Sequence, residues 1–344
     1  MVMKKRNLNI FDAGIAFVMA FILAQFTSII GTLLAEMIMQ AFGISNTKID
    51  AFWNTAGGYL LQAICMNIAF VLLFVYYYKH RNRKQVLQLK KPTNTTWNYV
   101  GFCLCIGVAT MFLLSGTLNY WQLLIDKLGF KSATLSYEIN SVGSYLISLI
   151  SLAVIPAICE EIIFRGLICS ALKEKGHWFA VILSSVMFAI FHFSPSQLLY
   201  PICFGIILSI VYLKTNNILF PILLHFINNA LTLSIQYFSS SSQAFTHSMG
   251  NLVYAIVTCA IWVGIMSWLI KDFKKYTTAT QSNIENYNQT NENQLTNNNV
   301  IENNNIVTKS TNKSTNNNVD KFNKIVLYGS IVLMIGIYLI LLAI

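Results

Sequence analysis

Long apolar runs separated by short polar segments dominate this chain of 344 residues. Most runs reach about 20 residues, the length that an α-helix needs to cross about 30 Å of hydrocarbon. Because backbone groups in lipid must be hydrogen-bonded within the protein, these runs predict transmembrane helices. The expected helices are residues 10–42, 56–78, 98–125, 143–172, 177–193, 197–213, 217–238, 249–270 and 324–344.

The pattern predicts an all-α fold, a polytopic transmembrane helical bundle of about eight core helices with one extra C-terminal helix. Changes in composition divide the chain into N-terminal membrane helices, a helical core that carries the candidate chemistry, an eighth membrane helix, a linker and a final helix. Asparagine fills 15 of the 40 positions from 281 to 320, so we expect the linker to be disordered. The divisions are 1–142, 143–240, 241–275, 276–323 and 324–344.

Composition and charge support a protein integral to the cell membrane. The chain is 55% hydrophobic and only 10% charged, against about 25% charged residues in soluble domains. Its net charge of +10 comes largely from clusters beside apolar runs, at 4–6, 79–91 and 271–275. The positive-inside rule places these clusters and the N-terminus in the cytoplasm. The charge therefore indicates a lipid bilayer as the partner and not nucleic acid.

Three charged residues, Glu160, Glu161 and Arg165, interrupt the apolar run 143–172. Each costs about 2.5–3.5 kcal/mol at the centre of a membrane helix, so such residues usually mark a functional site. Glu161 and Arg165 are four residues apart and share a helical face, which predicts a structural ion pair. Glu160 is rotated by about 100°. Its partner must come from another helix, a water molecule or a metal ion.

Later runs supply polar side chains for Glu160. His192 ends the run 177–193, while His225 and Asn229 are four apart and project from one helical face. Counted from the turn at 173–176, Glu160 and His192 lie about 21 and 22 Å along antiparallel helices, so we expect them at one depth. His225 is expected nearer the inner surface. Asn228 has nearly as suitable a spacing from His225 as Asn229 has.

Prolines and short segments predict irregular backbone around these residues. Pro156 removes the hydrogen bond to the Leu152 carbonyl and should bend its helix one turn before Glu160. Pro221 stands four residues before His225, and we expect a similar bend there. The turn at 194–197 joins two short runs and survives at membrane depth only if protein or a cavity surrounds it. Asn67 is expected to form a helix–helix hydrogen bond.

These residue types indicate hydrolysis of an amide in a secluded site. A carboxylate and an imidazole on either side of one water form a general base, the role expected for Glu160 and His192. A second imidazole and an amide can donate hydrogen bonds to a developing oxyanion, the role expected for His225 and Asn229. Glu160, His192 and His225 are equally a candidate ligand set for a divalent metal such as zinc. The sequence leaves the metal-dependent and metal-free mechanisms open.

The spacings Glu160-Glu161-x-x-x-Arg165, Phe188-x-x-x-His192 and His225-x-x-x-Asn229 resemble the three motifs of the CAAX-protease and bacteriocin-processing (Abi) family, in the family's order. The resemblance covers about residues 145–240. It implies an intramembrane endopeptidase, either metallo- or glutamate-dependent, that acts on a peptide or protein at the membrane. It also implies that Glu160 and His192 activate the water and that His225 and Asn229 hold the oxyanion. Many bacterial members are linked to bacteriocin immunity.

Two other functions fit the same polar residues. A non-catalytic protein of this fold would bind a peptide, as an immunity protein does. A transporter or proton relay would also keep intramembrane carboxylates and imidazoles. Against transport, the sequence shows no inverted repeat of broken helices.

Overall fold

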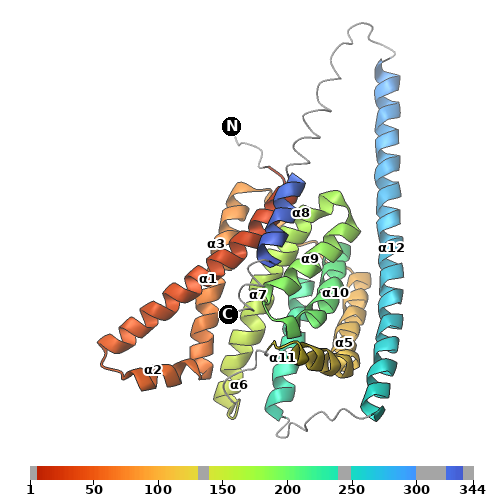
Figure 1. Ribbon diagram of the computed structural model, residues 1–344. Coiled ribbons are helices and arrows are strands. Elements are labelled where there is room, and N and C mark those ends of the chain that lie inside the picture. The colour runs from red at the N-terminus through yellow and green to blue at the C-terminus, as the bar shows by residue number, and fades with distance from the viewer. Residues whose placement is uncertain (1–5, 131–138, 239–248, 300–322, 336–344) are drawn as a thin grey trace.

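The computed structural model describes residues 6–130, 139–238, 249–299 and 323–335, and within these ranges the fold is all-α (Figure 1). Seven helical segments are long and apolar enough to cross a membrane, and two shorter apolar helices accompany them. These segments overlap the nine expected runs, so the chain is a multi-pass membrane protein. The seven are Ile10–Ala41, Ala56–His80, Asn94–Lys127, Val142–Lys175, Pro195–Thr215, Leu219–Phe238 and Asn251–Ser282, and the shorter two are His177–Phe191 and Asn323–Ile335.

Polar caps begin several of the helices. In α1 (Ile10–Ala41) the Asn9 side chain accepts from the Asp12 backbone N–H at 3.1 Å, and the Asp12 carboxylate accepts from the Asn9 N–H at 3.1 Å. Reciprocal bonds of this kind satisfy two of the four orphan N–H groups at a helix start. Similar caps begin α5 (Asn94–Lys127) and α6 (Val142–Ser148), and the remaining named helices of the first half are α2 (Asn46–Trp53), α3 (Ala56–His80) and α4 (Arg83–Val86).

The second half of α1 presents its apolar side chains outward. Phe26 is 60% exposed and Met37 is 65% exposed, and Figure 1 shows α1 tilted away from the rest of the bundle toward α2. Large exposed apolar surfaces are rare on soluble monomers, so this surface fits contact with lipid. The first half of α1, by contrast, buries Phe17 and its neighbours in the core.

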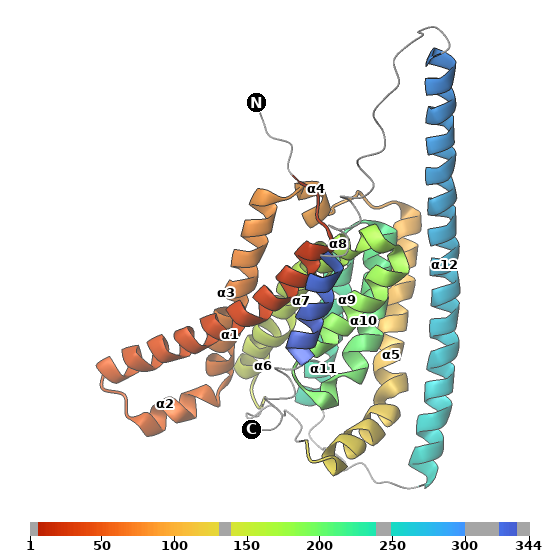
Figure 2. The same ribbon diagram turned by 45° about the horizontal axis from the view of Figure 1, so that its top comes forward.

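One long helix, residues 142–175, runs through the middle of the bundle (Figure 2). Its parts are α6, a π-helical stretch Leu149–Val154, α7 (Ile155–Glu161), a second π-helical stretch Ile162–Cys169, α8 (Ser170–Leu172) and a final 3-10 turn Lys173–Lys175. It packs against α1, α3, α9, α10 and α11. Because π-helical turns rotate the side chains that follow them, their position on either side of α7 affects where Glu160 and Glu161 point.

Helices α9 (His177–Phe191) and α10 (Leu199–Thr215) form a close antiparallel pair. A Cβ atom at Gly205 would lie 3.1 Å from the Ser185 Cβ, so glycine permits this approach. The turn between them is buried in protein, and its backbone polar groups need partners there. Trp121 Nε1 donates to the Pro195 carbonyl at 2.9 Å, and both Ser194 and Pro195 are buried.

Two segments near the C-terminal end differ from the expected division. Helix α12 runs from Met249 to Asn299, a length of 51 residues, or about 75 Å at 1.5 Å per residue. The linker predicted to begin at 276 is therefore helical up to 299, because extending an existing helix needs no new nucleus. Residues 300–322 and 336–344 lie outside the described ranges. The helix 323–335 packs on α1, where a Cβ at Gly14 would lie 3.0 Å from the Leu327 Cα.

The basic segments gather at one end of the bundle. The Asn82 N–H donates to the Arg6 carbonyl at 3.0 Å, and the Lys90 N–H donates to the Asn216 carbonyl at 3.1 Å. The Ile10 N–H donates to Glu174 at 2.9 Å, and Lys214 forms an ion pair with Asp272. The described basic segments that the positive-inside rule assigns to the cytoplasm therefore lie near one another in the structure.

Asp12 is the main electrostatic link at this end. It is 2% exposed, and Arg81 reaches its Oδ1 at 2.6 Å. These hydrogen bonds raise the pKa of the Arg81 guanidinium above its usual range.

Replacing Asp12 with alanine should lower the free energy of unfolding by about 3 kcal/mol, since it removes a buried charge partner and a helix cap. Arg6→Ala is the matched control: Arg6 is 60% exposed and 3.8 Å from Asp12, so its loss should cost less than about 0.5 kcal/mol. Thermal unfolding of the detergent-solubilised protein measures both. Equal losses in the two variants would contradict this description.

Candidate functional site

Glu161 and Arg165 meet on one face of the central helix. Arg165 Nη1 lies 2.6 Å from Glu161 Oε1, and both side chains are fully buried. Arg165 Nη2 also donates to the Gly205 carbonyl at 3.2 Å, which attaches the helix to α10. Glu161 Oε2 and Arg165 Nε have no hydrogen-bond partner among the described residues. The pair is thus buried but incompletely satisfied.

His225, on α11 (Leu219–Phe238), joins this ion pair. Its Nδ1 lies 2.8 Å from Glu161 Oε1, and its side chain is 6% exposed. An ionised carboxylate can only accept a hydrogen bond, so Nδ1 carries the proton and Nε2 is the atom that remains for other contacts. Sequence reasoning assigned His225 to an oxyanion and did not foresee its bond to Glu161. That bond joins two helices, so no spacing along the chain predicts it.

Phe188 is the shared neighbour of the two histidines. Its ring centroid lies 4.8 Å from that of His192 and 5.8 Å from that of His225, both edge-to-face. The Arg165 guanidinium stands over the same ring at 4.6 Å, a cation–π contact. His192 Nδ1 lies 2.8 Å from the Phe188 carbonyl, which can only accept. His192 therefore holds its proton on Nδ1, and a neutral imidazole then has its lone pair on Nε2.

Asn229 bonds to the carbonyl that Pro156 leaves free. Because Pro156 has no N–H, the helix before it is π-helical, and the Ile155 N–H donates to the Ile150 carbonyl. Asn229 Nδ2 donates to the Leu152 carbonyl at 3.2 Å. The amide expected to serve an oxyanion thus also satisfies a broken helix, and its second N–H is the one that a ligand would use.

Asn228 and Tyr200 extend this contact. Asn228 Nδ2 donates to Asn229 Oδ1 at 3.2 Å, and the Tyr200 hydroxyl donates to Asn228 Oδ1. Asn228 therefore orients Asn229, whereas the sequence left the two as alternatives. Tyr200 was missed because no motif or spacing connects it to α11.

Pro221 does not break a hydrogen bond within its helix, so the bend expected there has no cause. Helix α11 begins at Leu219, so Pro221 lies in its first turn, where a missing N–H costs no hydrogen bond. The Asn217 side chain accepts from the Leu219 N–H at 2.9 Å, so the helix start had a signal in the sequence.

Glu160 turns away from the ion pair and lines a cavity of about 400 Å³. The cavity lies between the central helix, α1 and α3, and Glu160 is 9% exposed within it. The hydrogen bonds of the neighbouring cluster run through Glu161, and none joins Glu160 to either imidazole in the part of the chain that the structure describes. The other lining residues are Gln25, Ser28, Tyr59, Gln62, Ala63, Met66, Asn67, Ser151, Leu152 and Pro156.

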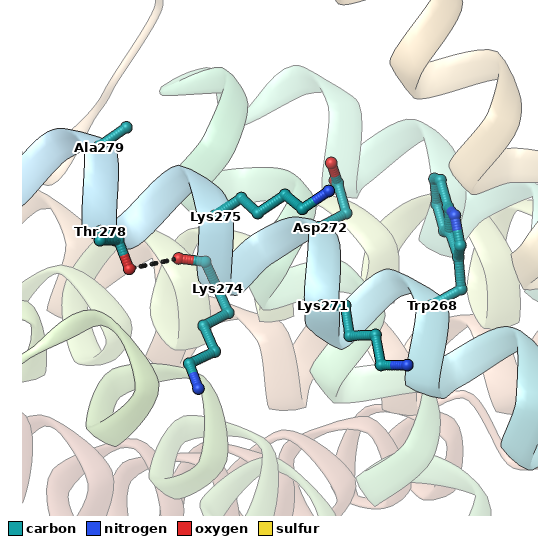
Figure 3. Close-up of a pocket in the computed structure, with 7 residues that line it drawn as sticks. All are labelled: Trp268, Lys271, Asp272, Lys274, Lys275, Thr278 and Ala279. Carbon is teal, nitrogen blue, oxygen red and sulfur yellow. Dashed lines mark hydrogen bonds between the residues drawn. The ribbon is translucent and has the colours of Figure 1, made fainter.

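A larger hollow, of about 700 Å³, lies along α12 (Figure 3). Three lysines line it, at positions 271, 274 and 275, together with Trp268 and Asp272. It contains no histidine, and its one carboxylate already pairs with Lys214. The hollow is therefore a basic surface at the end where the basic loops gather and does not fit the chemistry of Glu160.

The candidate metal ligands do not form a cluster. Over the described ranges, no group of three or more His, Cys, Asp or Glu side chains is close enough to hold a metal ion. Glu160 faces the cavity beside α1 and α3, whereas His225 is bound to Glu161. The arrangement of Glu160, His192 and His225 thus does not fit a shared ion, and we derive no step through one.

Two comparisons with known proteins both point to membrane peptidases. Residues 142–231 match the family described as "Type II CAAX prenyl endopeptidase Rce1-like". The chain is also 27% identical over 144 residues to the protein "Putative membrane peptidase YdiL" of Bacillus subtilis (strain 168), a match that covers 40% of this chain and 58% of that protein. The matched family segment holds all four expected site residues, Glu160, His192, His225 and Asn229. Over residues 142–231 the helical core of this chain is therefore similar to the CAAX protease family.

Proposed function

We propose that this protein is an intramembrane endopeptidase that hydrolyses a peptide bond of a membrane-associated peptide or protein. The observation that carries the proposal is a buried carboxylate, Glu160, at a cavity among apolar helices. Such a carboxylate is expensive in a membrane and is retained where it has a function. Similarity of residues 142–231 to a peptidase family and a bacterial relative named as a putative membrane peptidase support the same conclusion.

In the proposed reaction, Glu160 takes a proton from a water molecule in the cavity and His192 accepts a hydrogen bond from the same water at Nε2. The Nδ1–H of His192 is fixed by the Phe188 carbonyl, which leaves Nε2 as the basic atom. The water oxygen then attacks the carbonyl carbon of the peptide bond, the C–N bond breaks, and the proton passes to the leaving amine. Catalytic hydrogen bonds often shorten only when substrate binds, so the separation of Glu160 from His192 without substrate is compatible with these roles.

His225 and Asn229 are proposed to stabilise the oxyanion that forms during attack. Asn229 keeps one amide hydrogen beyond the one it gives to Leu152. His225 in its protonated form donates from Nε2, and the Glu161 carboxylate beside Nδ1 compensates the positive charge. Donors fixed in a water-poor site stabilise such a charge more strongly than water does.

One observation favours a second function, a non-catalytic peptide-binding or immunity protein. Glu160 forms no hydrogen bond with either imidazole among the described residues, so the structure also fits a polar cavity that only binds. A binding protein would keep its affinity for peptide, and its effect in the cell, after loss of Glu160.

We further propose that the N-terminus and the basic end of the bundle face the cytoplasm. The segments near Arg6, Arg81, Lys90 and Lys214 lie together at one end, so a single orientation places all of them on the same side. The positive-inside rule assigns that side.

Replacing Glu160 with glutamine should lower the rate of peptide cleavage at least about 100-fold, because the amide cannot take a proton from water. His192→Ala should lose activity by a similar factor. The measurement uses a mixture of quenched fluorescent peptides with randomised apolar positions, added to the protein in lipid nanodiscs. Glu36→Gln is the matched control, since the Glu36 carboxylate accepts from Trp53 at 3.0 Å outside the cavity. Cleavage by Glu160→Gln at the parental rate would refute the catalytic function.

Glu161 should behave differently from its neighbour. Glu161→Ala leaves the Arg165 charge buried without a partner and should lower the free energy of unfolding by about 3–5 kcal/mol. Glu160→Ala should cost less than about 1 kcal/mol. The double variant Glu161→Leu with Arg165→Met should recover most of the loss, since replacing both charges removes the desolvation penalty. Unfolding in detergent measures all three variants, and a stable Glu161→Ala protein would contradict the structural role.

A fluorescent protein that matures only in the cytoplasm reports the orientation. Fused after Lys91 it should fluoresce, and fused after Asn54 it should not, because one membrane span separates the two sites. The reverse pattern would place the basic end outside.

A further inference from the structure

The cavity beside Glu160 has walls from two helices that lie outside the matched family segment. Residues 142–231 match the family, whereas α1 contributes Gln25 and Ser28 and α3 contributes Gln62 and Asn67. Polar amide and hydroxyl side chains are unusual in helices this apolar and require a reason. Here they face a carboxylate across a cavity of about 400 Å³.

Asn67 has an unsatisfied buried acceptor at this wall. The residue is 4% exposed, and its Nδ2 donates to the Ala63 carbonyl of its own helix at 2.8 Å. Its Oδ1 has no hydrogen-bond partner among the described residues. The helix–helix hydrogen bond expected from the sequence is therefore absent from the described contacts. Buried polar atoms without a partner are rare in native structures, and the residue that carries this one lines a cavity, so a ligand in the cavity is a candidate for the missing donor.

The intrahelical bond determines which atom of Asn67 is left for another partner. Because Nδ2 donates to the Ala63 carbonyl, Oδ1 is the atom without a bond, and since it has almost no exposed surface, a ligand in the cavity reaches it after a rotation of the side chain. An acceptor selects an N–H or O–H donor. A peptide in extended conformation presents a backbone N–H at each residue other than proline, next to the carbonyl groups that a hydrolase attacks.

We propose that Asn67, which lines the same cavity as Glu160, is a substrate-positioning residue. Its Oδ1 accepts a hydrogen bond from a backbone N–H of a peptide bound in extended conformation. The inference rests on the proposed peptidase function. It places the substrate chain between α3 and the central helix, with Met66, Leu152 and Pro156 as its apolar contacts. In this proposal, α1 and α3 bind the substrate, while the proposed catalytic residues lie on or next to α7, α9 and α11.

The test uses Asn67→Leu, which is close to isosteric and removes the acceptor. The probe is the best-cleaved sequence from the quenched peptide mixture, assayed in lipid nanodiscs. A series of variants of this peptide, each N-methylated at a different backbone nitrogen, removes one N–H donor at a time. Thr27→Val is the matched control on the neighbouring helix α1, since the Thr27 hydroxyl donates to the Leu23 carbonyl at 2.9 Å and Thr27 does not line the cavity.

Asn67→Leu should lower kcat/KM about tenfold, while its unfolding temperature stays equal to or above that of the parent, because an unpaired buried acceptor is removed. A merely structural asparagine would lose stability instead. One N-methyl position should slow cleavage by the parent and have little further effect on Asn67→Leu, the non-additive behaviour of two groups that contact each other. Thr27→Val should cleave like the parent.

Three results overturn the inference, and they are distinguishable. If Asn67→Leu cleaves like the parent while Glu160→Gln is inactive, the peptidase function stands and the role of Asn67 falls. If every N-methyl peptide loses the same factor with Asn67→Leu as with the parent, Asn67 does not contact a substrate N–H. If Glu160→Gln cleaves like the parent, the proposed function itself fails, and this inference fails with it.

Discussion

A guanidinium with no exposure to solvent, that of Arg165, is the constraint around which the central helices pack. Its charge is compensated by Glu161 on the same helix, by the Gly205 carbonyl on α10 and by the face of Phe188 on α9. His225 on α11 adds a fourth contact through Glu161. Removing one partner of such a cluster leaves an uncompensated charge, so the helices that supply the partners must stay together. Because two of its polar atoms have no partner in the described part of the chain, the cluster is not the most stable arrangement possible, which favours a functional reason for its presence.

The two adjacent glutamates of the central helix have different surroundings. Glu161 binds His225 on α11 and pairs with Arg165, which contacts α9 and α10, while Glu160 faces the cavity beside α1 and α3. A rotation of about 100° between successive residues is enough to give two neighbours different surroundings. The π-helical turns on either side of α7 and the Leu152 carbonyl held by Asn229 fix that orientation. In the proposed mechanism, the buried cluster supplies the rigid support and the cavity is where the reaction takes place.

Much of this arrangement follows from local rules, and the remainder depends on contacts between helices. The Glu161–Arg165 pair follows from a spacing of four, and the apolar runs follow from their length and composition. Pro156 predicts a free Leu152 carbonyl, but only the packing of α11 shows that Asn229 donates a hydrogen bond to it. Pro221 was misinterpreted as a bend because the helix start at Leu219 was not recognised from Asn217. The unpaired acceptor of Asn67 could not be predicted, since its lack of a partner among the described residues depends on how neighbouring helices pack around it.

The central claim is that Glu160 activates a water molecule to cleave a peptide bond. Mass spectrometry of products formed in water enriched in ¹⁸O tests this claim most directly. The description predicts fragments from the parent whose new carboxyl termini carry ¹⁸O, and no such fragments from a folded Glu160→Gln protein. Fragments that lack the label, or labelled fragments formed equally by Glu160→Gln, would contradict it.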